Sequence, residues 1–361
     1  MSYLNREICI LTFEFNYNYG AVLQAYALSE KLKEFGYTPV ILNRGWKDYI
    51  NNRIKLKDIP GYLMGYFITL RHFYRFKRKY LRLSKPIRNR EEELDFCSQF
   101  KTVIVGSDQI WNDEIFESMG CHYFAECFPS STKRIAYAVS FGKDSFRIPI
   151  LYKKKILDLL SDFESISVRE YSGKLILKKL GFDSTFVLDP TFLISSECYP
   201  VKPGKDKNKY ICKYFLDEDE EKDNILKKIA SYFNLPIRNN YLNRDFNIPI
   251  IRRIVNNKYP SVEKWLYNIK NAQFVVTDSY HGMIFSLIFK KQFIVVKNPK
   301  RGNARFESLL KLLFLENRLI KSASELNEEL LNNRIDFQKI GSIIEKYRID
   351  SLNYLYSELN K

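Results

Sequence analysis

Residues 8–42 read ICILTFEFNYNYGAVLQAYALSEKLKEFGYTPVIL, and their pattern of apolar side chains indicates an α/β fold. The run 8–13 is typical of a buried strand, and residues 21–35 carry apolar side chains at helical spacing until Gly36 ends the helix. Residues 38–42 are strand-like again. A strand, a helix and a strand in this order predict a right-handed βαβ unit with parallel strands.

Strands and helices continue to alternate on both sides of a polar, turn-rich linker at 200–209. Before the linker we expect strands over residues 101–105, 134–140, 165–168 and 185–188. After it we expect strands over residues 210–216, 235–238, 273–277 and 292–296. The sequence therefore predicts two Rossmann-like, doubly wound domains, at 1–200 and 201–335, and a helical tail at 336–361. Because open α/β sheets bind ligands at the carboxyl ends of strands, we expect the site in a cleft between the domains.

Length and composition agree with two globular domains. A chain of 361 residues is too long for one ordinary core. With 45% hydrophobic and 28% charged residues, its composition is that of a soluble globular protein and not of a disordered or collagenous one. The N-terminus lacks the features of a signal peptide, and the longest apolar run, residues 59–70, is shorter than the ~20 residues of a membrane span. We therefore expect a cytoplasmic protein without a transmembrane segment.

The cysteines predict a reduced core. The chain has six, with no CxxC pair, and most lie in apolar runs. Cys121, His122 and Cys127 are close enough in sequence to form half of a metal site. However, the chain has only three histidines and no second pair at ligand spacing. The sequence therefore predicts no metal.

The net charge of +16 is concentrated in residues 44–90, which we call the basic aromatic insertion. This segment holds 14 Lys and Arg, two acids and nine aromatic residues. Nucleic acid, an anionic membrane surface and plain solvent around a helical hairpin all suit such a composition. Because an apolar run lies beside the basic run, as in interfacial helices, we favour the membrane surface over the solvated hairpin and expect no nucleic acid.

Polar side chains follow two of the strands predicted in the first domain. They are Asn18 and Gly20 at a helix start, Gln24 one turn later, and Ser107, Asp108, Gln109 and Trp111 after the strand 101–105. Free amides at a helix start bind anions or hydroxyls, and polar groups around an indole suit a sugar. Both groups also fit plain capped turns.

Charged side chains follow two later strands. Arg169 comes directly after the strand 165–168, where its guanidinium suits a carboxylate or phosphate bound by two hydrogen bonds. A structural ion pair with the neighbouring Glu170 is the alternative. Asp189 follows the next strand and either orients Arg169 or caps a turn.

The most distinctive motif is TDSYHG at 277–282, between an apolar strand and an apolar helix. Its histidine, His281, would lie at a helix N-terminus, where bound anions are favoured. A lone histidine is more often structural, but the strand end, the acidic neighbour and the helix start together favour catalysis. Lys297, Asn303 and Arg305 follow the next strand and add polar and cationic groups to the same rim.

An ordered set of these blocks resembles the polysaccharide pyruvyl transferase family. The blocks are NYNYGAVLQAYAL, VGSDQIWN, AYAVSFG, SVREYSG, VLDPTFL, VVTDSYHGMIFSLIF and N-x-R-F-E-S-L-L from Asn303. The resemblance covers the chain from about Ile8 to Leu315 and implies a GT-B-like pair of Rossmann-type domains. It also implies transfer of a pyruvyl group from phosphoenolpyruvate to a sugar of a surface polysaccharide repeat unit, which forms a cyclic ketal and releases phosphate.

The resemblance places Arg169 and His281 at the donor, with His281 as general acid or phosphate contact. The full donor set that we expect is Arg169, Ser279, His281, Gly282, Lys297, Asn303 and Arg305. The acceptor set that we expect is Asn18, Gly20, Gln24, Ser107, Asp108, Gln109 and Trp111, with Asp108 as candidate base. Better-known members of the family carry arginine where this chain has Ser279. Either Arg305 supplies that charge or this branch uses another donor.

The resemblance implies a lipid-linked oligosaccharide acceptor at the inner face of the plasma membrane. The basic aromatic insertion would then hold the enzyme beside its substrate. Phosphoenolpyruvate is the co-substrate of this scheme, which needs no cofactor and no metal. Two alternatives stay open: a GT-B-type glycosyltransferase that uses a sugar nucleotide, and a non-catalytic binding protein.

Overall fold

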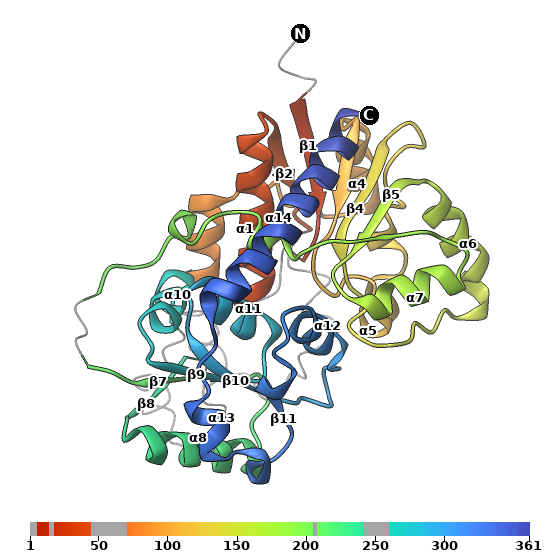
Figure 1. Cartoon of the computed structure of the whole chain (residues 1–361). Helices are drawn as coiled ribbons and strands as arrows, with labels where there is room; N and C mark the ends of the chain where they lie inside the picture. The colour runs from red at the N-terminus through yellow and green to blue at the C-terminus, as the bar shows by residue number, and fades with distance from the viewer. Residues whose placement is uncertain (1–5, 14–17, 45–70, 205–207, 241–259) are drawn as a thin grey trace, which may run out of the picture. The chain divides into compact units, whose positions relative to one another are not determined.

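The structure is a computed structural model that describes residues 6–13, 18–44, 71–204, 208–240 and 260–361 (Figure 1). The chain divides into two compact units. The N-terminal unit takes its described residues from Met1–Lys55, Lys77–Ile194 and Ile344–Lys361, and the C-terminal unit takes its own from Leu56–Phe76 and Ser195–Ile343. The last helix, α14 (Phe337–Asn360), therefore begins in the C-terminal unit and ends in the N-terminal unit.

The N-terminal unit contains a six-stranded parallel sheet of order β2-β1-β3-β4-β5-β6. Its strands are β1 (Glu7–Leu11), β2 (Thr38–Ile41), β3 (Thr102–Val105), β4 (Lys133–Val139), β5 (Phe163–Val168) and β6 (Thr185–Phe186). The predicted βαβ unit is confirmed, because β1 leads through a helix to β2 and Ile8 pairs with Pro39 in parallel register. The strand order reverses between β1 and β3, so a switch point for ligand binding lies at their carboxyl ends.

Helices flank this sheet (Figure 1). They are α1 (Tyr19–Glu34), α4 (Arg90–Ser98), α5 (Asp113–Met119), α6 (Ile150–Ser161), α7 (Tyr171–Lys179) and the short turns η3 (His122–Phe124) and η4 (Pro190–Phe192). One hydrophobic core joins the sheet to these helices through fully buried side chains such as Val103, Trp111, Ile156 and Leu177. Burial of an aliphatic side chain contributes about 1.5–3 kcal/mol, so this core fixes the loops that leave the strands.

The C-terminal unit contains a second parallel sheet, of order β11-β10-β9-β7-β8. Its strands are β7 (Ile211–Tyr214), β8 (Ile237–Asn239), β9 (Phe274–Thr277), β10 (Gln292–Val296) and β11 (Leu319–Ile320). Its helices are α8 (Glu220–Phe233), α10 (Val262–Lys270), α11 (Tyr280–Ile288), α12 (Ala304–Leu312), α13 (Glu328–Asn332) and the turns η5 (Ser196–Cys198), η6 (Glu316–Arg318) and η7 (Ala323–Glu325). Here the strand order reverses between β7 and β9.

The predicted fold class is confirmed in each unit: both are α/β with a parallel sheet, and a helical tail ends the chain. The prediction missed β11, because its two residues are too few to show a pattern. None of the six cysteines, all of them in the described residues, forms a disulfide, and all except Cys198 are buried, as expected of a reduced core.

The basic aromatic insertion is described only in part, because its residues 45–70 lie outside the described residues. Residues 71–80 form a helix. Phe73 and Phe76 of this helix are buried, whereas Tyr74 is 56% exposed. Within the described ranges, no helix combines the length and the apolarity that a membrane crossing needs.

Candidate active site

In the N-terminal unit, the predicted charged residues meet at the carboxyl edge of the sheet. Arg169 directly follows β5, and its side chain is completely buried. Its Nη1 donates to Asp189 Oδ2 at 2.5 Å, and its Nη2 donates to Asp108 Oδ1 at 2.9 Å. Its Nε lies 3.9 Å from Glu170 Oε2. The Arg169 guanidinium therefore contacts three carboxylates of its own unit. Its predicted role in binding the donor stays a prediction.

The loop after β3 brings Asp108 to this cluster in an unusual backbone conformation. Asp108 has φ 77, which non-glycine residues seldom adopt, and its side chain is 9% exposed. Gly106 has φ +125, and a Cβ there would lie 2.2 Å from the carbonyl oxygen of Tyr137. Only glycine fits this position, so β4 and the loop constrain each other.

A chain of hydrogen bonds joins three further residues of this edge. The backbone amide of Ser107 donates to Gln24 Oε1 at 3.0 Å, and Gln24 Nε2 donates to Thr12 Oγ1 at 2.8 Å. Gln24 is completely buried on α1. The structure thus brings together Gln24, Ser107 and Asp108 of the predicted acceptor set at the β1–β3 switch point.

The remaining acceptor candidates serve the local fold. Asn18 caps α1 by accepting from the Gly20 amide at 2.9 Å. Trp111 is completely buried, its Nε1 donates to the Tyr123 carbonyl at 2.9 Å, and its ring stacks on Phe124. In this conformation the indole contributes to the core, because its faces are covered by other side chains. The acceptor roles of Asn18, Gly20, Gln109 and Trp111 stay predictions.

In the C-terminal unit, a buried carboxylate occupies the β7–β9 switch point. Asp278 directly follows β9 and is 1% exposed. Its two oxygens accept from the Leu216 and Asp217 amides at 2.6 and 3.2 Å, from Lys222 Nζ at 2.9 Å and from Asn298 Nδ2 at 2.8 Å. Burial raises the pKa of Asp278, and the Lys222 ammonium opposes that rise. These contacts fix the loop after β7 against the loop after β10.

A second carboxylate, Asp217, holds the loop after β10. It accepts from Asn298 Nδ2 at 2.9 Å and from the Arg301 guanidinium. Burial alone would raise the pKa of Asp217, but the hydrogen bonds from Arg301 and Asn298 lower it to about 2. The loop that carries Lys297 and Asn303 is therefore tied to the sheet by an ionised carboxylate.

The TDSYHG motif forms the start of α11. Ser279 caps this helix by accepting from the Gly282 amide at 3.4 Å. A Cβ on Gly282 would lie 2.3 Å from Thr277 Oγ1, so the helix packs too closely on β9 for any other residue. His281, in the first turn, is 5% exposed. Where the better-known family members carry arginine, this chain therefore uses Ser279 as a helix cap.

Arg305 also contacts Tyr280. Its guanidinium carbon is 5.5 Å from the centre of the Tyr280 ring, which itself lies 5.5 Å from the His281 ring. Its Nη2 donates to the Arg301 carbonyl at 3.0 Å. The structure therefore brings Arg305 and His281 to the same part of the unit, where both contact the Tyr280 ring.

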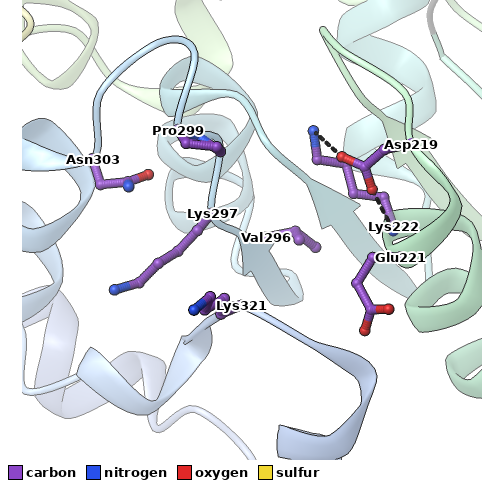
Figure 2. Close-up of a pocket in the computed structure, with 8 residues that line it drawn as sticks. All are labelled: Asp219, Glu221, Lys222, Val296, Lys297, Pro299, Asn303 and Lys321. Carbon is purple, nitrogen blue, oxygen red and sulfur yellow. Dashed lines mark hydrogen bonds and ion pairs between the residues drawn. The ribbon is translucent and has the colours of Figure 1, made fainter.

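A pocket of about 490 Å³ opens at this carboxyl edge (Figure 2). Its lining consists of Asp219, Glu221, Lys222, Val296, Lys297, Pro299, Asn303 and Lys321. Figure 2 shows Lys297 and Lys321 across the pocket from the residues of α8. Three ammonium groups and two carboxylates line the pocket, but Lys222 Nζ already binds Asp278 at 2.9 Å and Lys297 Nζ lies 3.5 Å from Glu307. Lys297 and Lys321 are therefore the cations that the pocket offers to a small anion.

The pocket contains part of the predicted donor set. Lys297 and Asn303 line it, whereas His281 and Arg305 are not among its lining residues in the described part of the chain. Lys222 and Lys321 were not predicted. Asp217 was not predicted either, although it follows the strand β7 closely, as Asp278 follows β9.

Solved structures of low sequence identity share the fold. A putative UDP-N-acetylglucosamine 2-epimerase from Listeria monocytogenes matches with TM-score 0.54 and 10% identity, over 99% of this chain and 96% of that chain. The glycotransferase of kitacinnamycin matches with TM-score 0.52 and 10% identity, over 98% of both chains. An S. aureus MnaA–UDP co-structure matches with TM-score 0.52 and 11% identity, over 98% and 97%. The predicted GT-B-like fold is thereby confirmed.

Comparison of sequences is more specific. The family model described as polysaccharide pyruvyl transferase matches residues 18–300, well over half of the chain. No curated protein matches. The matched range includes the loop after β3, the β7–β9 switch point and the TDSYHG motif, and it ends just after Lys297.

Proposed function

The chain belongs to the polysaccharide pyruvyl transferase family, and from this we propose that it transfers a pyruvyl group from phosphoenolpyruvate to two hydroxyls of a sugar. The product would be a cyclic ketal on a surface polysaccharide repeat unit. The family match over residues 18–300 carries this proposal. The cationic pocket of the C-terminal unit supports it, because phosphoenolpyruvate is a small molecule with a phosphate and a carboxylate.

The proposed reaction needs one acid, one base and several cations. A proton goes to the methylene carbon of the enol, and the resulting oxocarbenium-like centre is attacked by the first sugar hydroxyl. Phosphate then leaves with a proton, and the second hydroxyl closes the ketal. We assign the acid to His281 and the charge stabilisation to Lys297 and Arg305, because these side chains lie at one edge of the C-terminal sheet.

Arg305 is our candidate for the charge that Ser279 does not provide. The cap formed by Ser279 leaves no cation at that position of the motif. Arg305 stands beside Tyr280, next to His281, and is 6% exposed. A guanidinium held in so buried a place has few rotamers, which suits it to fix a planar carboxylate or phosphate.

In the N-terminal unit we propose Asp108 as the base for the acceptor hydroxyl. Arg169 binds the Asp108 carboxylate at 2.9 Å, which orients it. We thus give Arg169 a positioning role. Gln24 and Ser107 lie buried at the same switch point, where their hydrogen bonds support the loop that carries Asp108.

We further propose that the protein works at an anionic membrane surface, where a lipid-linked acceptor would be found. Two features support this partner. Arg71, Arg75 and Arg78 are exposed on the helix 71–80. At the start of α6, Ile150 and Leu151 are 91% and 92% exposed, next to Lys153 and Lys154, which are exposed too. Apolar tips beside lysines suit insertion between anionic headgroups.

Cosedimentation with anionic vesicles tests the membrane partner. We expect the charge-neutralised variant of Arg75, Arg78 and Lys79 and the variant with Ile150→Asp and Leu151→Asp to bind at least several-fold less than wild type. Leu175→Asp, at a 60% exposed position on α7, is the matched control and should bind normally. Equal binding by all four proteins would refute the proposal.

Acceptor-dependent release of phosphate from phosphoenolpyruvate tests the reaction. A panel of lipid-linked or aryl galactosides, mannosides and N-acetylhexosamines serves as acceptors. We expect wild type to release phosphate with at least one of them and His281→Ala to be slower by about 10²–10⁴-fold, as for loss of a general acid. Thermal stabilisation by a nucleotide-sugar but not by phosphoenolpyruvate, with no phosphate released, would favour glycosyl transfer instead.

A further inference from the structure

Two pairs of metal-ligand residue types meet in the N-terminal unit, away from the Arg169 cluster. Glu93 and Cys97 lie one turn apart on α4, so both side chains project from the same face of that helix. His122 and Cys127 come from η3 and the segment after it. The sequence alone did not indicate a second pair, because Glu93 and Cys97 are separated from His122 by an entire strand and helix.

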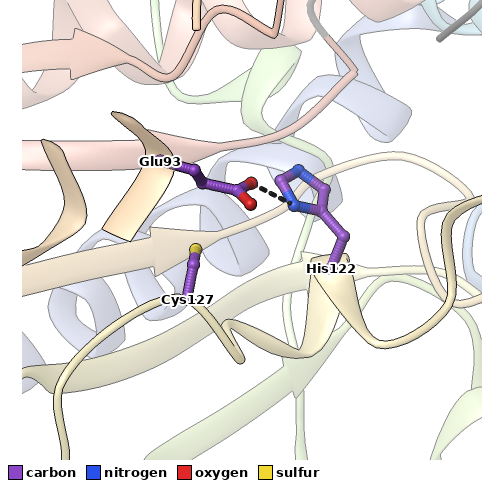
Figure 3. A group of neighbouring side chains, drawn as sticks. All are labelled: Glu93, His122 and Cys127. Carbon is purple, nitrogen blue, oxygen red and sulfur yellow. Dashed lines mark ion pairs between the residues drawn. The ribbon is translucent and has the colours of Figure 1, made fainter. Parts of the chain in front are cut away.

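The side chains of Glu93, His122 and Cys127 point toward one another (Figure 3). Ligand atoms of Glu93, His122 and Cys127 all lie within 4.8 Å of one another. Cys97 Sγ lies 3.0 Å from Cys127 Sγ. All four residues are at most 2% exposed. Three donors of three chemical kinds therefore lie together in a buried space, and in the described residues Glu93, His122 and Cys127 are the group that could hold a metal ion, with the Cys97 thiol beside it.

Two of these donors are poorly satisfied without an ion. Glu93 Oε1 and His122 Nδ1 are 3.0 Å apart, yet both atoms are buried without an aligned hydrogen bond among the described residues. A buried polar atom in that state costs about 1–3 kcal/mol. Two ligands of one metal ion approach each other to about this distance without bonding, so an ion would remove the cost.

The surrounding charges leave one carboxylate oxygen for a metal. Arg90 Nη1 binds Glu93 Oε2 at 2.8 Å and so orients the carboxylate with Oε1 toward His122. Arg44 Nε is 3.8 Å from Oε1. A divalent ion with two thiolates and one carboxylate has a net charge of −1, and the nearby guanidinium groups of Arg44 and Arg90 are favourable neighbours for that negative charge.

We propose that Glu93, Cys97, His122 and Cys127 bind a zinc ion that fastens α4 to the segment 122–127. Thiolate, imidazole and carboxylate together are a donor set that zinc accepts in tetrahedral geometry, and four protein ligands make a closed, structural site. On binding, each thiol loses its proton and forms a zinc–sulfur bond, with no redox change. The site takes no part in the transfer chemistry and stands independently of the proposed function.

The site also contacts the structure that supports the loop of Asp108. Tyr123, directly after His122, accepts the hydrogen bond of the Trp111 indole at 2.9 Å. Trp111 in turn belongs to the loop that carries Asp108. A metal that fixes the segment 122–127 therefore fixes the support of that loop.

Metal content tests the proposal. Full-length protein is produced with zinc and reductant, dialysed, and analysed by plasma mass spectrometry. We expect about one zinc per chain for wild type and none for His122→Ala or Cys127→Ser. Cys212→Ser, at another buried cysteine, and Cys198→Ser, at the exposed one, are the matched controls and should retain zinc. Equal zinc in all variants, or none in wild type, would overturn the proposal.

Two measurements on wild type keep the test informative if the variants fail to fold. Cobalt in place of zinc should give the visible absorption of a tetrahedral site and a thiolate charge-transfer band. A chelator should lower the melting temperature by several degrees, and added zinc should restore it. Absence of both effects, or recovery of Cys97 and Cys127 as a disulfide from zinc-supplied, reduced protein, would contradict a zinc site.

Discussion

The two switch points have the same topology but a different balance of charge. In the N-terminal unit, the single guanidinium of Arg169 lies among the carboxylates of Asp108, Glu170 and Asp189. In the C-terminal unit, Asp217 and Asp278 are paired with Arg301 and Lys222, and the pocket beside them adds the ammonium groups of Lys297 and Lys321. A parallel sheet thus sets where a site forms, while the residues after each strand decide which charge it accepts. The acidic edge suits a hydroxyl acceptor, and the cationic edge suits an anionic donor.

The largest expected effect comes from removing Arg169, the cation that lies among the carboxylates at the edge of the N-terminal sheet. We expect Arg169→Met to lower the free energy of unfolding by about 3–5 kcal/mol, because it leaves buried carboxylates without their counter-ion. Urea denaturation measures the loss. Arg348→Met, which breaks an ion pair with Glu345 on α14, is the control and should cost less than about 1 kcal/mol. Similar losses in the two variants would mean that the Arg169 cluster is not held by its charges.

The cationic edge depends on close packing rather than on one ion pair. Gly282→Ala should destabilise the protein by about 1–3 kcal/mol, since the new Cβ would meet Thr277 Oγ1 at 2.3 Å. It should also abolish turnover, because His281 lies in the same turn. Gly341→Ala in α14 has open space around the Cβ and should stabilise the protein by about 0.5–1 kcal/mol. Thermal unfolding compares the pair, and a neutral Gly282→Ala would disprove the packing argument.

The sequence predicts which residues follow the strands better than it predicts which of these residues pair with one another. The strand and helix pattern places Asp108, Arg169, Asp189 and Asp278 correctly after strands, because period and turn residues are local properties. Pairing across the sheet is not local. Arg169 binds Asp108 across 61 residues and Lys222 binds Asp278 across 56, and no spacing rule links those positions.

Trp111 shows a second limit of the sequence. Polar neighbours and an indole resemble a sugar platform, but the ring is buried between Phe124 and Phe141. Composition of a motif does not tell which face of a loop meets the core.

Lys321 shows the opposite error, because it lines the pocket but was not predicted. It follows β11, a strand of two residues, which is too short to show a pattern in the sequence.

The pocket can be probed more gently through Lys321. We expect Lys321→Ala to raise the KM for phosphoenolpyruvate by about tenfold, as for one lost charge-assisted hydrogen bond, with little change in kcat or in the KM of the acceptor. Lys311→Ala, at an exposed position on α12, is the control and should leave all three constants unchanged. Steady-state kinetics with varied donor measures the effect, and an acceptor-specific change would argue that the pocket holds the sugar.

The smallest expected effect concerns pH. The pKa of Asp217 in the folded protein is about 2, below its ordinary value of 3.8, so its pairing with Arg301 stabilises the fold above about pH 4. That contribution is lost as the pH falls from about 4 toward 2. Because Asp217 is partly exposed, we expect about 1 kcal/mol. Asp217→Asn should flatten the stability profile over this range, and an unchanged profile by urea denaturation would contradict the assignment.

The mass of the sugar product tests the central claim most directly. Wild-type protein is incubated with phosphoenolpyruvate and an acceptor that supports phosphate release, and the acceptor is then analysed by mass spectrometry. We predict a gain equal to pyruvic acid minus water, which is the mass of a ketal, and no gain with His281→Ala. An acceptor that stays unmodified by phosphoenolpyruvate but gains a sugar from a nucleotide-sugar would contradict pyruvyl transfer.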